Sequence, residues 1–285
     1  MNKIVSFKPD ESLSAYISGY FYAINQFDKS ANQFYTPKGT AAITIPLEIN
    51  PNSYLMYPDK TSKIYFEKFV PFLFGQMSKL GVSEIQGRFD FFVIVFTPIG
   101  LFHFLDGPAV QMTDRVMRLD RLGLSELHKK LRNLFETHTE IESCLEQVNK
   151  YLIDHFISMP KKKISEFIPS VIHQIHMKKG IVNLESLVEN LGINNRTFQL
   201  HFKNVIGISP KLFCRITRFN FLLQALDAVP AADILDFAVQ FGYADKPHLY
   251  KDFKEFVGMT PLKYLRLINN VNAIVEKEVR NKLSR

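Results

Sequence analysis

The phrase FKNVIGISPKLF at residues 202–213 is written a second time as FKEFVGMTPLKY at residues 253–264. Phe-Lys, Gly and Pro stand at matching positions in the two copies. Glycine lacks a Cβ and therefore often ends a helix in the left-handed conformation, while proline after Ser or Thr suits the first turn of a helix. Each copy therefore predicts the end of one helix and the start of the next.

The likeness extends upstream of both phrases, where Gly192 corresponds to Gly242. Each copy then predicts a helix, a tight glycine turn and a second helix, with Asn194 and Asp245 as the N-caps of the second helices. This arrangement is a helix-turn-helix, in which the second helix enters the major groove of DNA. Two ordinary helical hairpins are the alternative, but the tandem repeat in a basic region favours the DNA interpretation.

The chain from about residue 168 onward is expected to be entirely helical. The expected helices are Pro169–Lys179, Asn183–Asn190, Asn195–Val205, Pro210–Val229, Ala232–Gln240, Lys246–Val257 and Pro261–Val279. The helix between the two repeats should be buried, because its apolar positions are Phe213, Ile216, Phe219, Leu222, Leu223 and Leu226. Its length of roughly 30 Å is close to the ~34 Å between successive major grooves on one face of DNA.

The net charge of +7 is unevenly distributed along the 285 residues. Residues 1–168 hold 19 Lys or Arg against 18 Asp or Glu, a net charge of +1, whereas residues 169–285 hold 16 against 10, a net charge of +6. A basic C-terminal part beside a neutral N-terminal part indicates that only one part meets a polyanion. Charge alone would also fit RNA or a membrane surface.

The N-terminal part has the pattern of strands followed by two helices. Strands are expected at Ala41–Leu47, Ser53–Tyr57, Lys63–Phe66, Pro71–Phe74 and Phe89–Thr97, separated by turn residues. The first helix should bury Leu124, Leu127, Leu131 and Leu134, and the second, over residues 140–157, should bury Cys144, Leu145, Val148, Leu152 and Phe156. The stretch SMPKKK at residues 158–163, with one proline and three consecutive lysines, then predicts a linker.

The predicted fold is therefore an α+β N-terminal domain, with a small and mostly antiparallel sheet plus two helices, followed by an all-α C-terminal domain. The C-terminal domain holds two helix-turn-helix subdomains joined by a long helix. The expected boundaries are 1–160 for a sensor or dimerisation domain, 161–168 for the linker, 169–270 for the DNA-binding domain and 271–285 for a helical or frayed tail.

Residues 168–268 resemble the DNA-binding domain of the AraC/XylS family of bacterial transcription regulators. The resemblance rests on the tandem hairpins, the linking helix and above all AVQFGYADKPHLYKDFKEFVGMTPLKYLR at residues 238–266. Residues 96–120, FTPIGLFHFLDGPAVQMTDRVMRLD, resemble a sensor-like domain fused to such regulators. The resemblance implies an activator or a repressor that binds double-stranded DNA, with RNA polymerase and a second copy of the chain as candidate partners.

The resemblance also implies which side chains meet DNA, namely those on the exposed face of each second helix. In the first unit these are Asn195, Arg196 and Gln199 for base edges, with Thr197 and Lys203 nearer the phosphates. Leu200 is placed to contact a thymine methyl group. In the second unit the candidates are Lys246, His248 and Lys251. Pro247 and Asp252 suggest that the second helix positions the protein more than it reads bases.

No catalytic motif is present, so an enzyme is not expected, and neither a cofactor nor a metal site is predicted. His173 and His176 stand three residues apart on a helix, but no carboxylate or cysteine accompanies them at ligand spacing. The two cysteines, Cys144 and Cys214, are too isolated for a disulfide framework. The longest apolar run, Phe91–Phe96, is too short to cross a bilayer, and the charged N-terminus lacks the apolar stretch of a signal peptide. A cytoplasmic protein without a membrane partner is expected.

Two functional hypotheses remain open for the N-terminal part. In the first, it encloses a small-molecule effector that modulates DNA binding, for which the 26 phenylalanines of the chain could supply an apolar cavity. In the second, it only dimerises and no effector exists. The phenylalanines fit an ordinary core better than a cavity.

Overall fold

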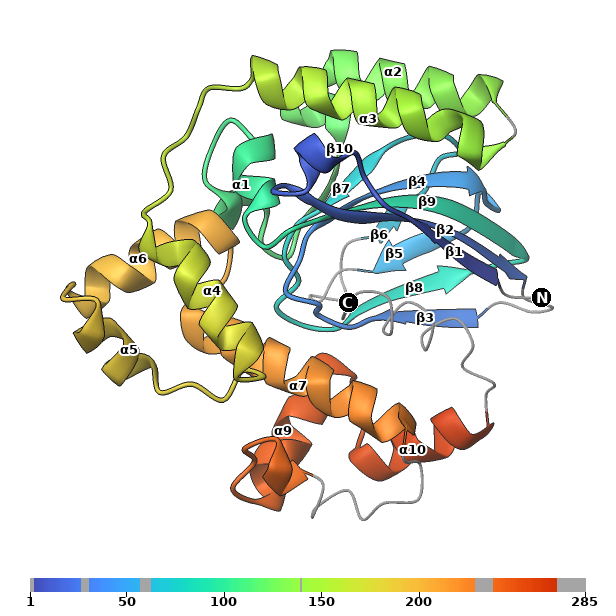
Figure 1. Ribbon diagram of the computed structural model, residues 1–285. Helices are drawn as coiled ribbons and strands as arrows, with labels where there is room; N and C mark the ends of the chain where they lie inside the picture. The colour runs from blue at the N-terminus through green and yellow to red at the C-terminus, as the bar shows by residue number, and fades with distance from the viewer. Residues whose placement is uncertain (1–2, 27–30, 57–62, 139, 229–237, 271–285) are drawn as a thin grey trace.

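The computed structural model describes residues 3–26, 31–56, 63–138, 140–228 and 238–270 of the chain. Its N-terminal half is built on two antiparallel sheets (Figure 1). The six-stranded sheet has the order β1 (Lys3–Phe7), β2 (Ile17–Gln26), β9 (Arg88–Phe96), β4 (Ala42–Glu48), β7 (Phe72–Phe74) and β10 (Val116–Arg118). The four-stranded sheet has the order β3 (Ala31–Tyr35), β8 (Gly81–Ile85), β5 (Tyr54–Met56) and β6 (Lys63–Tyr65).

The five predicted strands correspond to β4, β5, β6, β7 and β9, but the sheets are larger than expected. The strands that the sequence pattern did not predict are β1, β2, β3, β8 and β10. The ten-residue β2 is the most consequential of these, because it lies between β1 and β9 in the six-stranded sheet. Its sequence ISGYFYAINQ lacks a clean alternation, since consecutive residues Tyr20 and Phe21 are both buried on opposite faces.

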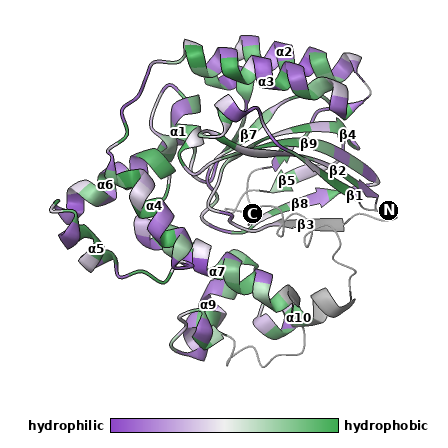
Figure 2. Ribbon diagram, viewed as in Figure 1, coloured by the Kyte–Doolittle hydropathy of each residue, from purple (hydrophilic) through white to green (hydrophobic). Residues whose placement is uncertain are grey.

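The two predicted helices are present, and they cover the outer face of the six-stranded sheet. These are α2 (Ser125–Thr137) and α3 (Ile141–Ser158), which show alternating polar and apolar residues in Figure 2. Their buried residues Leu131, Val148 and Leu152 join one core with Phe92 and Phe96 of β9. Shorter helical turns complete this half: η1 (Glu11–Leu13), α1 (Gly100–Phe104), η2 (Ala109–Met112) and η3 (Leu119–Leu122). A second core of aromatic and aliphatic side chains includes members of both sheets.

The C-terminal half is helical, as predicted. Its described helices are α4 (Phe167–Met177), α5 (Leu184–Asn190), α6 (Asn195–Ile206), α7 (Pro210–Ala228), α9 (Lys246–Phe256) and α10 (Pro261–Asn270). All six apolar positions expected in the connecting helix α7 are buried in one core with residues of α4, α6 and α9. The predicted helix at 232–240 lies outside the described residues except for 238–240, and so do the tail at 271–285 and the end of the last predicted helix.

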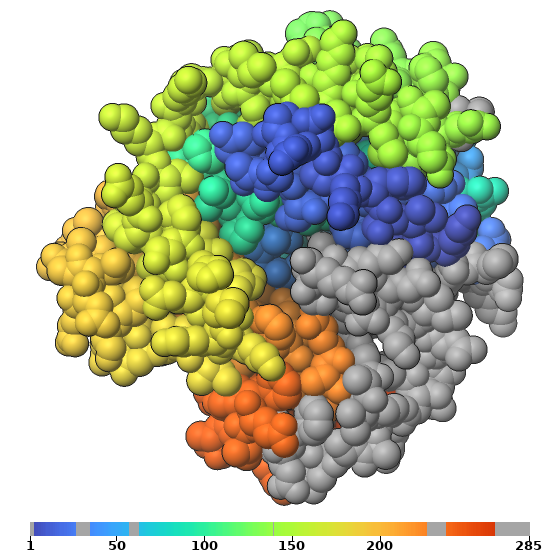
Figure 3. Space-filling model, in the orientation of Figure 1, coloured from blue at the N-terminus to red at the C-terminus, as the bar shows by residue number. Residues whose placement is uncertain are grey.

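The two halves are in contact, as the space-filling view shows (Figure 3). Helix α6 packs against α1 and η2. The hydroxyl of Thr113 donates a hydrogen bond to the carbonyl of Gly207, which ends α6. The segment 159–166 between α3 and α4 forms no helix or strand, and the ammonium of Lys162 donates to the carbonyls of Phe102, Leu105 and Gly107.

Candidate nucleic-acid interface

The first helix-turn-helix unit consists of α5, a turn at Gly192 and α6. Gly192 has a φ of 63° in the left-handed region. The side chain of Asn194 accepts a hydrogen bond from the backbone N–H of Arg196 at 2.8 Å, which confirms the predicted N-cap. Phe198 and Phe202 are buried in the core of the C-terminal half. The opposite face of α6 is therefore the face left for a partner.

The five candidate DNA contacts of the first unit are all exposed on α6. They are Asn195, Arg196, Thr197, Gln199 and Lys203. Gln199 Nε2 donates to Asn195 Oδ1 at 3.1 Å, so these two amide side chains are held side by side. Leu200, with 57% of its surface exposed, also lies on this solvent side. An amide pair, a guanidinium and an apolar tip are the kinds of group that recognise base edges in a major groove.

In the second unit a turn at Gly242 leads into α9, and only residues 238–240 of the helix before this turn are among those described. Gly242 has a φ of 73°, and Asp245 Oδ1 accepts from the backbone N–H of His248 at 2.8 Å, which confirms the second N-cap. Lys246 and Lys251 are exposed on α9. His248 differs from both, because it is half-buried and its Nε2 lies 3.3 Å from Arg218 Nη2.

The interpretation of Asp252 was wrong, because its carboxylate does not face the side available to DNA. Asp252 is 0% exposed and lies on the same face of α9 as the buried Leu249, Phe253 and Phe256. Its Oδ1 accepts from Arg215 Nη2 at 2.6 Å, and its Oδ2 accepts from the hydroxyl of Tyr243 at 3.0 Å. The carboxylate is thus part of a buried ion-pair cluster and does not repel phosphate. Of the two observations that favoured a positioning role for α9, only Pro247 remains.

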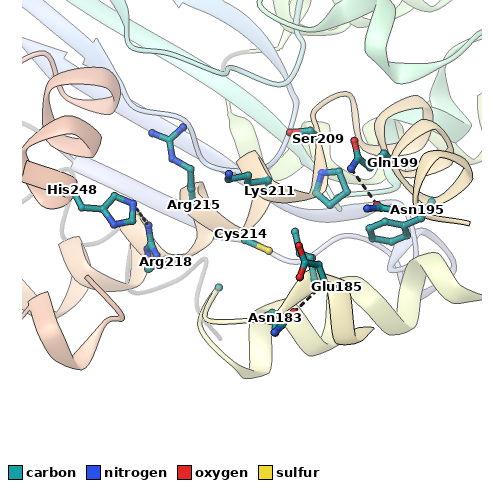
Figure 4. Close-up of a pocket in the computed structure, with 15 residues that line it drawn as sticks. Asn183, Glu185, Asn195, Gln199, Ser209, Lys211, Cys214, Arg215, Arg218 and His248 are labelled. Carbon is teal, nitrogen blue, oxygen red and sulfur yellow. Dashed lines mark hydrogen bonds between the residues drawn. The ribbon is translucent and has the colours of Figure 1, made fainter. Parts of the chain in front are cut away.

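A groove with a volume of about 580 Å³ separates the two recognition helices (Figure 4). Asn195 and Gln199 lie at one end of the groove, and His248 lies at the other. Between them, α7 contributes Lys211, Arg215 and Arg218. Positions 211, 215 and 218 are four and three residues apart, so their side chains share one face of the helix.

Sequence reasoning missed these α7 cations because it treated α7 as a buried helix. The signal was present in the spacing of Lys211, Arg215 and Arg218, which are four and three residues apart and so place three cations on one face of the helix. The repeat also offered Lys254, which corresponds to Lys203 in the aligned Phe-Lys pairs and is exposed on α9. Lys254 is therefore a further candidate for a phosphate contact.

The two arginines of α7 that line the groove form ion pairs with carboxylates of α9. Arg215 donates to both Asp252 and Glu255, and these two carboxylates raise the pKa of its guanidinium against the opposing effect of burial. Burial and the nearby Asp252 carboxylate raise the pKa of Tyr243, so its hydroxyl stays a hydrogen-bond donor. Burial also raises the pKa of the Cys214 thiol to about 11. Lys211 is exposed and takes part in no ion pair with the described residues.

The helix α7 sets the distance between the two units. Its 19 residues span roughly 28 Å at about 1.5 Å per residue. Ser209 Oγ accepts from the N–H of Leu212 at its start, as the repeated phrase predicted, and Pro210 is its first residue. The second phrase does the same at α10, where Thr260 Oγ1 accepts from the N–H of Lys263.

The histidines do not form a metal centre in the part of the chain that the structure describes, where no cluster of three or more potential metal ligands occurs. His176 instead packs edge-on against Phe213, with ring centroids 5.7 Å apart. His103 is a half-buried ring between Tyr16 and Phe102, and burial lowers its pKa. Among the described helices, none is long and apolar enough to cross a membrane.

Comparisons with known proteins agree with this architecture. Residues 187–267 match a family model described as a helix-turn-helix domain, and residues 5–118 match a domain of unknown function, DUF6597. The chain is similar to the crystal structure of ToxT from Vibrio cholerae, with 10% identity, a TM-score of 0.50 and coverage of 88% of this chain and 99% of ToxT. No curated protein sequence matches the chain with significance.

Two ToxT structures with bound molecules are also similar. One holds an unsaturated fatty acid, with 10% identity, a TM-score of 0.50 and coverage of 88% of this chain and 96% of that one. The other holds (E)-4-(8-methylnaphthalen-1-yl)but-3-enoic acid, with 10% identity, a TM-score of 0.52 and coverage of 87% and 99%. At such low identity these likenesses establish the fold of the chain.

Proposed function

We propose that the C-terminal half of this chain, which matches a helix-turn-helix model over residues 187–267, is an AraC-type domain that inserts α6 and α9 into adjacent major grooves of a specific DNA site. The domain makes the chain a DNA-binding transcription regulator. The observation that carries the proposal is the mounting of two helix-turn-helix units on the single helix α7. The length of α7, roughly 28 Å, is close to the distance of about 34 Å between successive major grooves on one face of DNA.

The first unit supplies most of the base contacts in this proposal. Arg196 pairs with guanine and Gln199 with adenine, as the bidentate geometry of these side chains allows. Asn195 is held beside Gln199 by their hydrogen bond and reads a neighbouring base. Thr197 and Lys203 bind phosphates on the flanks.

The second unit contributes phosphate contacts through Lys246 and Lys251, while His248 lines the groove between the units. Lys211, on the exposed face of α7, adds a phosphate contact between the two recognition helices. This arrangement predicts a continuous footprint across both grooves rather than two separate half-footprints.

Selection of bound sequences from random DNA, followed by titration at several salt concentrations, tests the proposal. The full chain should select a site with two conserved blocks about one helical turn apart. The affinity should fall steeply as salt rises, because each phosphate contact releases counterions. Selection of one block only, or of no sequence, would contradict insertion of two helices.

We infer further that a small molecule bound to the N-terminal half modulates DNA binding. Support comes from the ligand-bound ToxT structures and from an open pocket of about 540 Å³ in this chain, a volume typical of ligand sites. The pocket lies between η1, α1, the end of α3 and the segment that leads to α4. Tyr16, His103 and Phe156 form its aromatic side, and Lys161 adds a positive charge.

The position of this pocket offers a route to the DNA-binding half. Lys162, which also lines it, donates to carbonyls at the end of α1, and α1 packs against α6. A molecule that orders the pocket would therefore act on the support of the first recognition helix. Among the described residues, the lining holds basic and apolar side chains but no carboxylate, so an apolar body with an acidic group fits best.

Thermal unfolding of the full chain with a panel of aromatic and aliphatic carboxylates tests the effector proposal. A ligand that binds only the folded state must raise the unfolding temperature. Ile157, which is 77% exposed at the pocket, can be changed to Asp at little cost in stability, and this added charge should abolish the shift. A chain that dimerises in sedimentation yet responds to none of these compounds would favour the alternative, in which the N-terminal half only dimerises. RNA polymerase as a partner and a cytoplasmic location are parts of the same proposal.

A further inference from the structure

Arg218 on α7 contacts both the turn and the recognition helix α9 of the second helix-turn-helix unit. Its Nη1 donates to the carbonyl of Gly242 in the turn at 3.4 Å, and its Nη2 lies 3.4 Å from Asp252 Oδ2 on α9. Its guanidinium carbon stands 4.3 Å from the ring centroid of Tyr243. The side chain is only 12% exposed, so these contacts fix its position. The same Nη2 also lies 3.3 Å from His248 Nε2 (Figure 4).

The contact between Arg218 Nη2 and His248 Nε2 decides which nitrogen of the histidine ring carries the proton. A guanidinium group has five N–H donors and no acceptor, and it keeps its proton in proteins. The Nε2 atom of His248 must therefore accept the hydrogen bond, which requires a bare ring nitrogen. A neutral imidazole with a bare Nε2 carries its proton on Nδ1. Arg218 thus selects one of the two neutral forms of His248.

The second unit gains a defined hydrogen-bond donor from this selection. His248 is the third residue of α9, where its own N–H is capped by Asp245, and its ring lines the groove between the recognition helices. Ring packing against Tyr243, with centroids 5.5 Å apart, holds the imidazole further. With Nε2 occupied, Nδ1–H is the other polar group of the ring, and no hydrogen bond joins it to the described residues. A donor at the start of a recognition helix suits purine N7, guanine O6 or thymine O4.

We propose that Arg218 is a positioning residue that fixes His248 as a hydrogen-bond donor, so that the second unit reads a base with an acceptor in the major groove. This inference rests on the proposed DNA-binding function. It assigns base reading to the second unit, for which the sequence had suggested more positioning than base reading.

Arg215 provides a matched control on the same helix. It shares the carboxylate of Asp252 with Arg218 and also pairs with Glu255 at 2.7 Å. Its guanidinium lies over Phe256, with 5.1 Å to the ring centroid, in place of the Tyr243 ring that Arg218 covers. No hydrogen bond joins it to His248 among the described residues. Loss of Arg215 therefore weakens the same ion-pair cluster without releasing the imidazole.

Selection from random DNA with the wild-type chain, R218Q, R215Q, H248A and the double variant R218Q/H248A tests the proposal. R218Q and H248A should each weaken the base preference at one position of the second block by about 2- to 10-fold, the range of one hydrogen bond. The double variant should weaken it no further. R215Q should lower the unfolding temperature but keep the preference. Loss of preference in R215Q, or its retention in R218Q, overturns the inference.

Nitrogen-15 NMR of the imidazole rings in the wild-type chain gives a second test, which does not depend on DNA binding. The ring signals missing from H248A identify His248, and their shifts distinguish a protonated Nδ1 from a protonated Nε2. A protonated Nε2 overturns the inference whatever the selection shows. If the wild-type chain selects no sequence at all, the proposed function fails instead, and the two failures are thereby distinguished.

Discussion

Replacing Thr113 with valine removes a single hydroxyl from the contact between the N-terminal half and the first recognition helix. That hydroxyl donates to the carbonyl of Gly207, a buried residue that ends α6 in the left-handed conformation at a φ of 96°. Valine keeps the shape of threonine but cannot donate. The last turn of α6 should become less stable by about 1–3 kcal/mol, the cost of depriving a buried carbonyl of its donor.

Hydrogen exchange of the backbone amides at residues 205–207 measures this change directly. A loss of 1–3 kcal/mol corresponds to local opening that is about 5- to 150-fold more frequent. Thr97 is the matched control, since its Oγ1 donates to the carbonyl of Ala15 at 2.8 Å within the N-terminal half. T97V should leave exchange in α6 unchanged. Unchanged exchange in T113V, or equal effects of the two variants on α6, would refute the idea that the N-terminal half supports this helix.

Three further predictions concern DNA, the turns and pH. Arg196→Ala should cost about 1–3 kcal/mol of binding free energy on the selected site and relax the sequence preference, whereas Lys203→Ala should weaken binding to all sequences alike and lower the salt slope by about 1. Fluorescence anisotropy titrations compare the two variants, and an equal loss on every sequence for Arg196→Ala would contradict base reading. Gly192→Ala should lower the free energy of unfolding by about 1 kcal/mol, because a φ of 63° disfavours a side chain but no atom of the described residues lies within 4 Å of the added Cβ. Gly258→Ala should lower it more, because the added Cβ would meet Leu80 Cδ2 at 2.6 Å. Equal urea midpoints for the two variants would show that this contact is unimportant. Burial lowers the pKa of His155 despite the hydrogen bond to the carbonyl of Phe104, so the contribution of His155 to stability is fully present above about pH 6.5. It declines below that pH as the unfolded chain takes up a proton, and it levels off below the folded pKa. His155→Gln should therefore reduce the fall in urea midpoint between about pH 7.5 and 5.5, and an unchanged fall would assign that pH dependence to other groups.

Local signals were enough to predict the helix-turn-helix units. The N-caps Asn194 and Asp245 and the left-handed glycines that end α6 and begin the turns are decided by neighbours within a few residues, and all were confirmed. The DNA contacts themselves stay predictions, because exposure on α6 shows only which side chains are available. Exposure is a property of one helix face, and the 3.6-residue period reports it well.

Non-local pairing explains what the sequence did not reveal. The strand β2 pairs with β9 about seventy residues away, and its aromatic run gives no alternating pattern to find. Asp252 was misjudged for a related reason. A charged residue on a helix is assumed to face solvent, but its partners Arg215 and Arg218 come from α7, and only the packed structure brings them together.

Both copies of the repeated phrase also contact the N-terminal half of the chain near the end of their recognition helices. The first copy meets the N-terminal half at Gly207, and the second meets it where the N–H of Leu80 donates to the carbonyl of Glu255 at 3.3 Å. These two docking points are tied to each other, because Asp114, next to Thr113, accepts from the N–H of Ser78 at 2.6 Å. One small patch of the N-terminal half therefore supports the ends of both recognition helices. The spacing between the units is held by α7 on one side and by this patch on the other, so a ligand that shifts the patch would change how both helices fit DNA.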